Sequence, residues 1–205
     1  MSNASRPLDL LTPADRDDHS QGPADAPVTL IQYADFECLH CARAQPILRQ
    51  LRDEIPDAFR LVFRHFPLVA DHPRSAIASR AAVAAARQGH FWEMHDRLFE
   101  YQAHLSPEAF ELHAEDIGLD VERFLRDMSD AASTERIQRD MASGRASGVR
   151  GTPTFFLNGV RYGDAPDLPL LRRAILATAV EERRPVVPKR EIIGNWATDH
   201  ASAAQ

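Results

Sequence analysis

Apolar and polar residues alternate along the chain in a way that predicts a strand, a helix and a second strand near its beginning. An apolar, β-rich run at 28–33 predicts a buried strand, and apolar residues at helical spacing over 39–55 predict a helix after it. A second apolar run at 60–66 is ended by Pro67. Strand, helix and strand in this order form a βαβ unit, which favours a parallel sheet.

Residues 73–147 then change to helical patterning. The stretch begins with an Ala-rich segment, and Ser106 directly before Pro107 predicts a capped helix start. Asp120 can cap a further short helix, and apolar residues over 133–146 recur one helical turn apart. The pattern therefore predicts a block of helices between strands.

Strand character returns at 154–157. Asn158-Gly159 is a strong signal for a hairpin turn, with 160–162 as the returning strand. A last amphipathic helix is predicted over 168–182. The sequence thus predicts an α/β protein with four parts. These are an N-terminal arm at 1–27, a sheet domain at 28–72 and 148–182, an inserted helical lobe at 73–147, and a C-terminal tail at 183–205.

The two ends of the chain differ from the rest in composition. Residues 1–27 are rich in Asp, Ser, Gly and Pro, which predicts a loosely ordered arm, and residues 183–205 predict an extended tail. The first 27 residues contain no apolar run long enough for a signal peptide. The chain as given is therefore expected in the cytoplasm, or in the periplasm if a signal was trimmed from it.

The charge balance of the chain bears on whether it binds nucleic acid or an anionic membrane. The chain has 24 basic and 30 acidic residues, a net charge of -6, and no run of Lys and Arg. Neither nucleic acid nor an anionic membrane is therefore an expected partner. No apolar stretch approaches the roughly 20 residues that span a bilayer.

The chain has only two cysteines, Cys38 and Cys41, in the motif Cys-x-x-Cys. A disulfide that closes so small a loop removes little chain entropy, so it is a poor structural staple. The pair follows the first predicted strand and opens the helix after it. Unpaired N–H groups and the partial positive charge at a helix start stabilise a thiolate, which is the form that attacks disulfides. Cys38 is therefore predicted as the nucleophile and Cys41, one turn further on, as the resolving thiol.

Two neighbours of the pair would act on Cys38 in opposite directions. A partly cationic imidazole at His40, between the two cysteines, would favour the thiolate. Glu37, directly before Cys38, would raise the thiol pKa. Their net effect leaves the direction of electron flow open.

A zinc site is the alternative use of a Cys-x-x-Cys pair. Such a site would need two more ligands, and the candidates are Glu37, His40, His65 and His72. The chain has no second Cys-x-x-Cys, and His40 cannot easily join its own neighbouring cysteines on one metal. Redox chemistry is the preferred interpretation, with zinc binding or an inert pair as alternatives.

A second motif, Thr152-Pro153, opens the predicted strand at 154–157. A cis Thr152–Pro153 bond would leave the backbone of Thr152 free to pair with an extended substrate. The residues alone favour the commoner trans form.

Several segments in this order resemble the thioredoxin superfamily, and within it the DsbA-like group. The resemblance covers residues 24–182, and the chain is also similar to thioredoxin-like domains appended to some sodium/proton antiporters. The segments that carry it are Ala26-Pro27-Val28-Thr29-Leu30, Asp35-Phe36-Glu37-Cys38-Leu39-His40-Cys41, Phe63-Arg64-His65-Phe66-Pro67-Leu68, Phe91-Trp92-Glu93-Met94-His95 and Gly151-Thr152-Pro153-Thr154-Phe155.

The resemblance implies a thioredoxin fold, a central mixed sheet flanked by helices, with a helical insertion. It further implies that Pro153 is cis and packs against the cysteine pair, and that Thr152 hydrogen-bonds substrate backbone. One position departs from the superfamily. Where a buried acid often relays the proton of the second thiol, this chain has Gln32, which cannot titrate.

The sequence thus predicts a DsbA-family thiol–disulfide oxidoreductase that needs no metal or organic cofactor. Its expected partners are cysteine-containing proteins or peptides and a recycling partner of the glutathione or thioredoxin type. A non-enzymatic redox sensor or holdase, and a glutathione-linked transferase or isomerase, are the alternatives.

Overall fold

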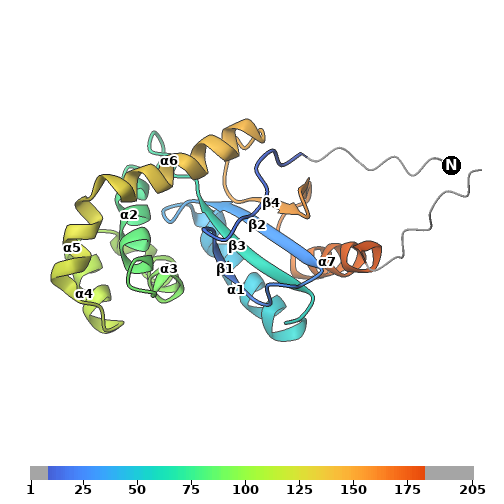
Figure 1. Cartoon of the computed structure of the whole chain (residues 1–205), viewed down its shortest axis with the longest axis horizontal. Helices are drawn as coiled ribbons and strands as arrows, with labels where there is room; N and C mark the ends of the chain where they lie inside the picture. The colour runs from blue at the N-terminus through green and yellow to red at the C-terminus, as the bar shows by residue number, and fades with distance from the viewer. Residues whose placement is uncertain (1–8, 183–205) are drawn as a thin grey trace, which may run out of the picture.

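A five-stranded mixed sheet organises residues 9–182, the part of the chain that the computed structural model describes (Figure 1). Its order is β1-β3-β2-β4-β5. The strands are β1 (His19–Gln21), β2 (Val28–Ala34), β3 (Phe59–His65), β4 (Thr154–Leu157) and β5 (Val160–Arg161). β2 and β3 run parallel and all other neighbours are antiparallel. The predicted βαβ unit and the central mixed sheet are therefore confirmed.

The turn between β4 and β5 is made by Asn158 and Gly159. Both have left-handed backbone conformations, with φ of 44° and 84°. Positive φ at both central residues is the requirement of a type I′ hairpin turn, which Asn-Gly meets best.

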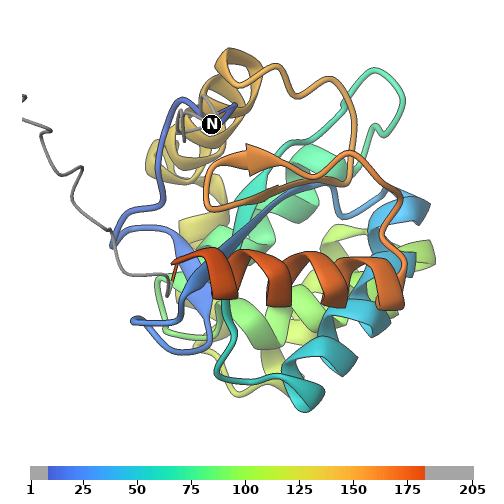
Figure 2. The same cartoon turned by 90° about the vertical axis from the view of Figure 1, so that its right-hand side faces the viewer.

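Two helices, α1 (Leu39–Glu54) and α7 (Leu168–Glu182), cover one face of the sheet, and Figure 2 shows α7 crossing in front of it. Leu48 of α1 and Ile175 of α7 are buried in one cluster with Leu30 and Leu61 of the sheet. This packing fixes α1, and with it the helix start that carries the cysteines, against β2 and β3.

The helices between β3 and β4 form a lobe beside the sheet (Figure 1). They are α2 (Ser75–Ala86), α3 (Phe91–Glu100), the short 3-10 helix η1 (Gln102–His104), α4 (Pro107–Asp116), α5 (Val121–Ser129) and α6 (Ala131–Ala146). The predicted caps are present, since the side chain of Ser106 accepts the N–H of Ala109 and that of Asp120 accepts the N–H of Arg123.

α6 leads the chain back over the second face of the sheet. The hydroxyls of Ser143 and Tyr33 lie 2.8 Å apart, and Asp140 accepts the backbone N–H of His65 at 3.1 Å. Gly144 allows this close approach, because a Cβ there would lie 2.9 Å from the ring of Phe66.

The N-terminal segment differs from the prediction of a loosely ordered arm. β1 pairs antiparallel with β3, and Asp18 forms a buried ion pair with Arg64 of β3 at 2.8 Å. The same guanidinium donates to the carbonyls of Thr12 and Pro13 at 2.8 Å. A local composition rich in Asp and Pro did not reveal this order, because it depends on a partner 46 residues away. The predicted tail at 183–205, like residues 1–8 of the arm, lies outside the described residues.

Within residues 9–182, no helix has the length and apolar character needed to cross a bilayer.

Candidate active site

The start of α1 places Cys38 at the N-cap of a 16-residue helix. The N–H of Cys38 donates to the carbonyl of Asp35, and its own carbonyl accepts the N–H of Ala42 at 3.1 Å. The side-chain amide of Gln102, in η1, donates to the carbonyls of Phe36 and Cys38 at 2.7 and 3.0 Å. The lobe therefore holds the cysteine turn from outside the sheet domain.

The two thiols lie in different environments. Cys38 keeps 5% of its surface exposed and its Sγ lies 3.2 Å from the carbonyl oxygen of Thr152, whereas Cys41 is fully buried. Both are unpaired thiols. The approach of Cys38 to Thr152 joins two motifs that lie 114 residues apart in the chain.

The same environments separate the acidities of the two thiols. A hydrogen bond from Cys41, with further support from the side chain of Thr152 and the backbone N–H groups of Cys41 and His40, outweighs burial and lowers the pKa of Cys38 to about 5. Burial, together with the hydrogen bond to Cys38 and its negative charge, raises the pKa of Cys41 well above its ordinary value. At neutral pH the first sulfur is a thiolate and the second is a thiol.

The two predicted modulators beside Cys38 have different surroundings. His40 is exposed in the first turn of α1, and its backbone N–H, not its imidazole, is among the main causes of the low pKa of Cys38. Glu37 is paired with Arg74, with Oε1 3.2 Å from Nε and Oε2 2.7 Å from the backbone N. The negative charge of Glu37 is thus largely offset.

Gln32 lies in the core of β2 with no exposed surface. Neither atom of its amide has a hydrogen-bond partner among the described residues. Alternation along β2 places it on the same face as Leu30, the face that α1 covers.

The Thr152–Pro153 peptide bond is cis and directly precedes β4. Since the carbonyl of Thr152 contacts Cys38, this loop and the helix start form one site. The structure therefore brings together Cys38, Cys41, Thr152 and the backbone of His40, whereas the side chain of Glu37 turns to Arg74.

Two residues that the sequence did not single out as redox residues also belong to this region. Asp35 is fully buried, and its Oδ2 lies 2.8 Å from Nδ1 of His72. Asp35 stands within the motif that carries the resemblance, while His72 was considered only as a metal ligand. Among residues 9–182, no group of three or more His, Cys, Asp or Glu side chains is arranged to hold a metal ion.

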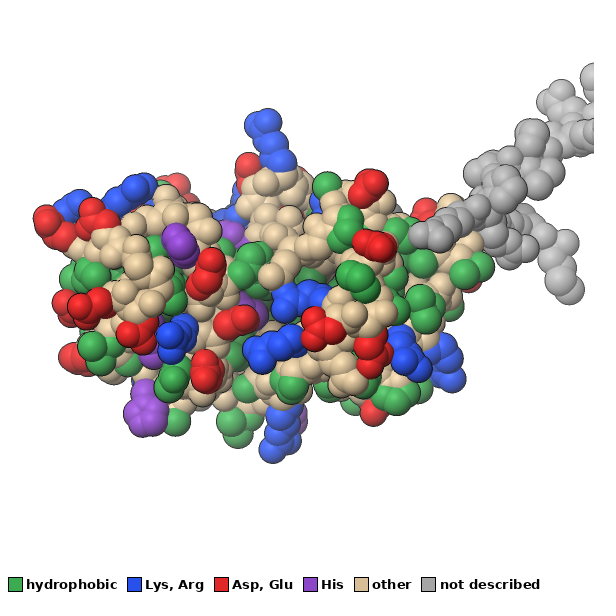
Figure 3. All heavy atoms as spheres, turned by 90° about the horizontal axis from the view of Figure 1, so that it is seen from below, with side chains coloured by type: hydrophobic (Ala, Val, Ile, Leu, Met, Phe, Trp, Pro, Cys, Tyr) green, Lys and Arg blue, Asp and Glu red, His purple; other side chains and the backbone are tan. Residues whose placement is uncertain are grey.

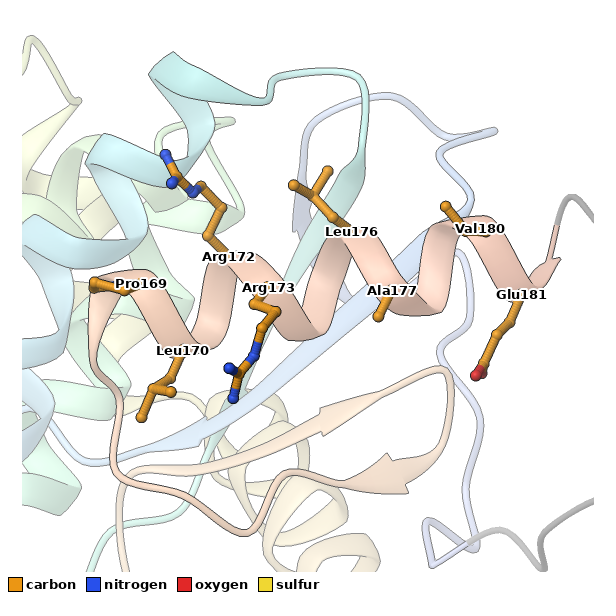
Figure 4. Close-up of a pocket in the computed structure, with 8 residues that line it drawn as sticks. All are labelled: Pro169, Leu170, Arg172, Arg173, Leu176, Ala177, Val180 and Glu181. Carbon is orange, nitrogen blue, oxygen red and sulfur yellow. The ribbon is translucent and has the colours of Figure 1, made fainter.

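The outer surface offers two further observations. In the view of Figure 3, acidic and basic side chains are interspersed and neither sign gathers into one patch. An open hollow runs along the outer face of α7, between Leu176 and Val180 on one side and Leu170 and Arg173 on the other (Figure 4). None of the residues that line this hollow belongs to the cysteine site.

Comparison with known proteins supports the fold and the class. A family model described as thioredoxin matches residues 14–177. The sodium/proton antiporter NhaA 3 of Salinispora tropica is 42% identical over 177 residues, which are 86% of this chain and 27% of that protein. The NhaA antiporter of Herminiimonas arsenicoxydans is 42% identical over 186 residues, 90% of this chain and 30% of that protein. The chain therefore spans less than a third of the length of these relatives.

Solved structures give the same picture. A thioredoxin-like oxidoreductase from Silicibacter pomeroyi has a TM-score of 0.73 at 28% identity, covering 82% of this chain and 94% of its own. BdbD from Bacillus subtilis has a TM-score of 0.72 at 18% identity, covering 80% of this chain and 93% of its own. The thiol–disulfide exchange protein α-DsbA2 from Wolbachia pipientis has a TM-score of 0.71 at 22% identity, covering 80% and 88%.

The sheet order and the helical lobe define a DsbA-like thioredoxin fold. The chain belongs to the thioredoxin family. The resemblance inferred from its motifs, including that to domains of sodium/proton antiporters, is thereby confirmed.

Proposed function

We propose that this protein is a thiol–disulfide oxidoreductase in which Cys38 is the nucleophile and Cys41 the resolving thiol. The observation that carries the proposal is the placement of two sulfurs at one helix start, with Cys38 at the N-cap beside Thr152 and Cys41 fully buried, which lowers the pKa of the first and raises that of the second. The family fold, shared with a thioredoxin-like oxidoreductase and with the thiol–disulfide exchange protein α-DsbA2, supports the same class of reaction.

The reaction follows from the protonation states. In the reducing direction the Cys38 thiolate attacks one sulfur of a substrate disulfide, so that a Cys38–substrate bond forms and the other substrate sulfur leaves as a thiolate. Cys41 then loses its proton and attacks the sulfur of Cys38, so that the Cys38–substrate bond breaks and the second substrate sulfur also leaves as a thiolate. The Cys38–Cys41 disulfide forms, and the substrate has gained two electrons. The oxidising direction runs through the same steps in reverse.

The surroundings of Cys38 favour polypeptide substrates. The backbone of Thr152, two residues before β4, offers pairing to an extended chain, and Leu39 leaves 65% of its surface exposed beside Cys38. The proposed substrates are cysteine-containing proteins or peptides, with a glutathione-type or thioredoxin-type partner to recycle the pair.

The low pKa of Cys38 also affects the direction of electron flow. A stabilised thiolate favours the reduced pair and makes the corresponding disulfide a stronger oxidant. The pKa of Cys38, about 5, lies between two reference values for such thiols, near 7 in thioredoxin and near 3.5 in DsbA. We therefore expect a reduction potential between about -270 and about -120 mV, the values for those two proteins.

The test measures both directions of exchange. The wild type should reduce insulin disulfides with a thiol donor and should oxidise a reduced, unfolded protein, whereas Cys38→Ser should do neither. Cys41→Ser should accumulate a mixed disulfide through Cys38, because attack can occur but resolution cannot. Thermal unfolding of each variant checks that the fold is intact.

Two outcomes would reject the proposal. A folded wild type that performs neither reaction is not an oxidoreductase of this kind. A mixed disulfide that forms through Cys41 in Cys38→Ser, and not through Cys38 in Cys41→Ser, would reverse the assigned roles.

A further inference from the structure

A fully buried carboxylate, Asp35, lies three residues before the proposed nucleophile. Its Oδ1 accepts the backbone N–H of Glu37 at 2.8 Å, and its Oδ2 accepts the N–H of Leu68 at 2.8 Å. The same Oδ2 lies 2.8 Å from Nδ1 of His72, whose side chain is 24% exposed. The carboxylate thus ties the turn before Cys38 to the loop between β3 and α2.

A buried carboxylate needs a compensating positive charge, and His72 is the group placed to supply it. Burial by itself lowers the pKa of His72. The hydrogen bond to Asp35 and the negative charges of Asp35, Cys38 and Glu37 outweigh burial and raise that pKa above its ordinary value. The imidazole is therefore cationic over a wider pH range than a free histidine.

The other charges nearby do not replace this cation. The negative groups that act on the imidazole are Asp35, Cys38 and Glu37, and the nearest charged residues along the chain are Asp71 and Arg74. Arg74 is the only other cation of this set, and it is bound to both oxygens of Glu37. His72 is left to balance Asp35 and the thiolate.

We propose that His72, held in place by Asp35, is a positioning residue for thiol–disulfide exchange, and that its positive charge stabilises the Cys38 thiolate. This inference rests on the proposed function in taking Cys38 as the reacting thiol. His72 touches neither substrate nor sulfur in this role. It acts through its charge, and that charge is lost as the pH rises and the imidazolium gives up its proton.

The charges of Cys38 and His72 should shift each other's pKa by equal amounts, and both shifts can be measured. If the negative charge of Cys38 raises the pKa of His72, the positive charge of His72 must lower the pKa of Cys38 by the same amount. Removing either charge should therefore shift the titration of the other group equally and in opposite directions. A purely structural His72 would not produce this equality.

The experiment measures both titrations in the reduced full chain. Thiolate absorbance near 240 nm follows Cys38 in the wild type, His72→Asn and His72→Lys. Asn keeps an N–H donor for Asp35 without the charge, and Lys keeps the charge. Imidazole proton chemical shifts follow His72 in the wild type and in Cys38→Ser, a variant that leaves the contact between Asp35 and His72 untouched.

We expect the pKa of Cys38 to rise by roughly 0.2 to 0.7 unit in His72→Asn, since the pair is partly exposed and therefore screened. It should return toward the wild-type value in His72→Lys, and the pKa of His72 should fall by the same amount in Cys38→Ser. An unchanged pKa of His72 in Cys38→Ser would overturn the proposal, as would equal values for Cys38 in the Asn and Lys variants.

Neither titration requires turnover. A protein that shows the reciprocal shifts but exchanges no disulfides would refute the proposed function and leave only the stabilisation of the Cys38 thiolate by His72 standing. An active protein without the shifts would do the opposite.

Discussion

The hydrogen bond from Cys41 is the largest cause of the low pKa of Cys38, so its removal should make Cys38 a weaker acid. Cys41→Ala deletes the donor, whereas Cys41→Ser keeps a hydroxyl of nearly the same size at the same position. Each variant has only one cysteine, so the remaining thiol titration belongs to Cys38 alone.

The size of the shift follows from the strength of the bond. A hydrogen bond to a charged group contributes about 1.5–3 kcal/mol, and one pKa unit corresponds to about 1.4 kcal/mol. From about 5 in the wild type, the pKa of Cys38 should therefore rise by roughly one to two units in Cys41→Ala. The backbone N–H groups at the helix start remain and keep Cys38 more acidic than a free thiol. Cys41→Ser should stay near the wild-type value.

The assay is the rate of alkylation of Cys38 by iodoacetamide between pH 3 and pH 9, with thiolate absorbance as an independent check. Equal pKa values in Cys41→Ala and the wild type would show that the neighbouring thiol does not stabilise the thiolate. A wild-type value near that of a free cysteine would refute the reasoning altogether, because the arrangement of donors around Cys38 would then have no electrostatic effect.

Three further predictions concern stability. Asp18→Ala leaves Arg64 buried without its partner and should lower the free energy of unfolding by about 3–5 kcal/mol in denaturant titrations, against less than about 1 kcal/mol for Glu122→Ala in an exposed helix pair. Gly144→Ala places a Cβ 2.9 Å from an aromatic ring and should cost about 1–3 kcal/mol by the same measurement, and no loss would mean that α6 moves away freely. The reduced protein should gain stability relative to Cys38→Ser as the pH rises from about 5 toward 9.0, because the pKa of Cys38 is lower in the folded than in the unfolded chain. This contribution is lost as the pH falls through the folded value, and a flat difference between the two proteins would contradict it.

Local patterns predicted the elements that local forces determine. The apolar runs gave β2 and β3, the helical spacing gave α1 and α7, and Asn158-Gly159 gave the hairpin turn. The position of Cys38 at a junction of strand and helix was visible for the same reason. Each of these features depends on residues within one or two turns of each other.

Features that depend on distant pairing were not predicted. β1 is a three-residue strand whose order comes from β3 and from the Asp18–Arg64 ion pair, and no local signal marks it. The contact between Asp35 and His72 spans 37 residues, so both looked like unrelated polar positions in the sequence. Gln102 likewise reaches the cysteine turn from the inserted lobe, where a lone Gln carries no signal.

The lack of a buried acid at position 32 matters less for the loss of the Cys41 proton when the pKa values of the two thiols are considered together. Burial raises the pKa of Cys41, and two further causes are its hydrogen bond to Cys38 and the negative charge of Cys38. Both of these causes require a Cys38 thiolate. When Cys38 forms the mixed disulfide, its charge is gone and its lone pairs are poorer acceptors, so only burial still opposes ionisation of Cys41. Attack on a substrate therefore makes the resolving thiol more acidic at the step where it must lose its proton, and Gln32 need not accept that proton for the change to occur.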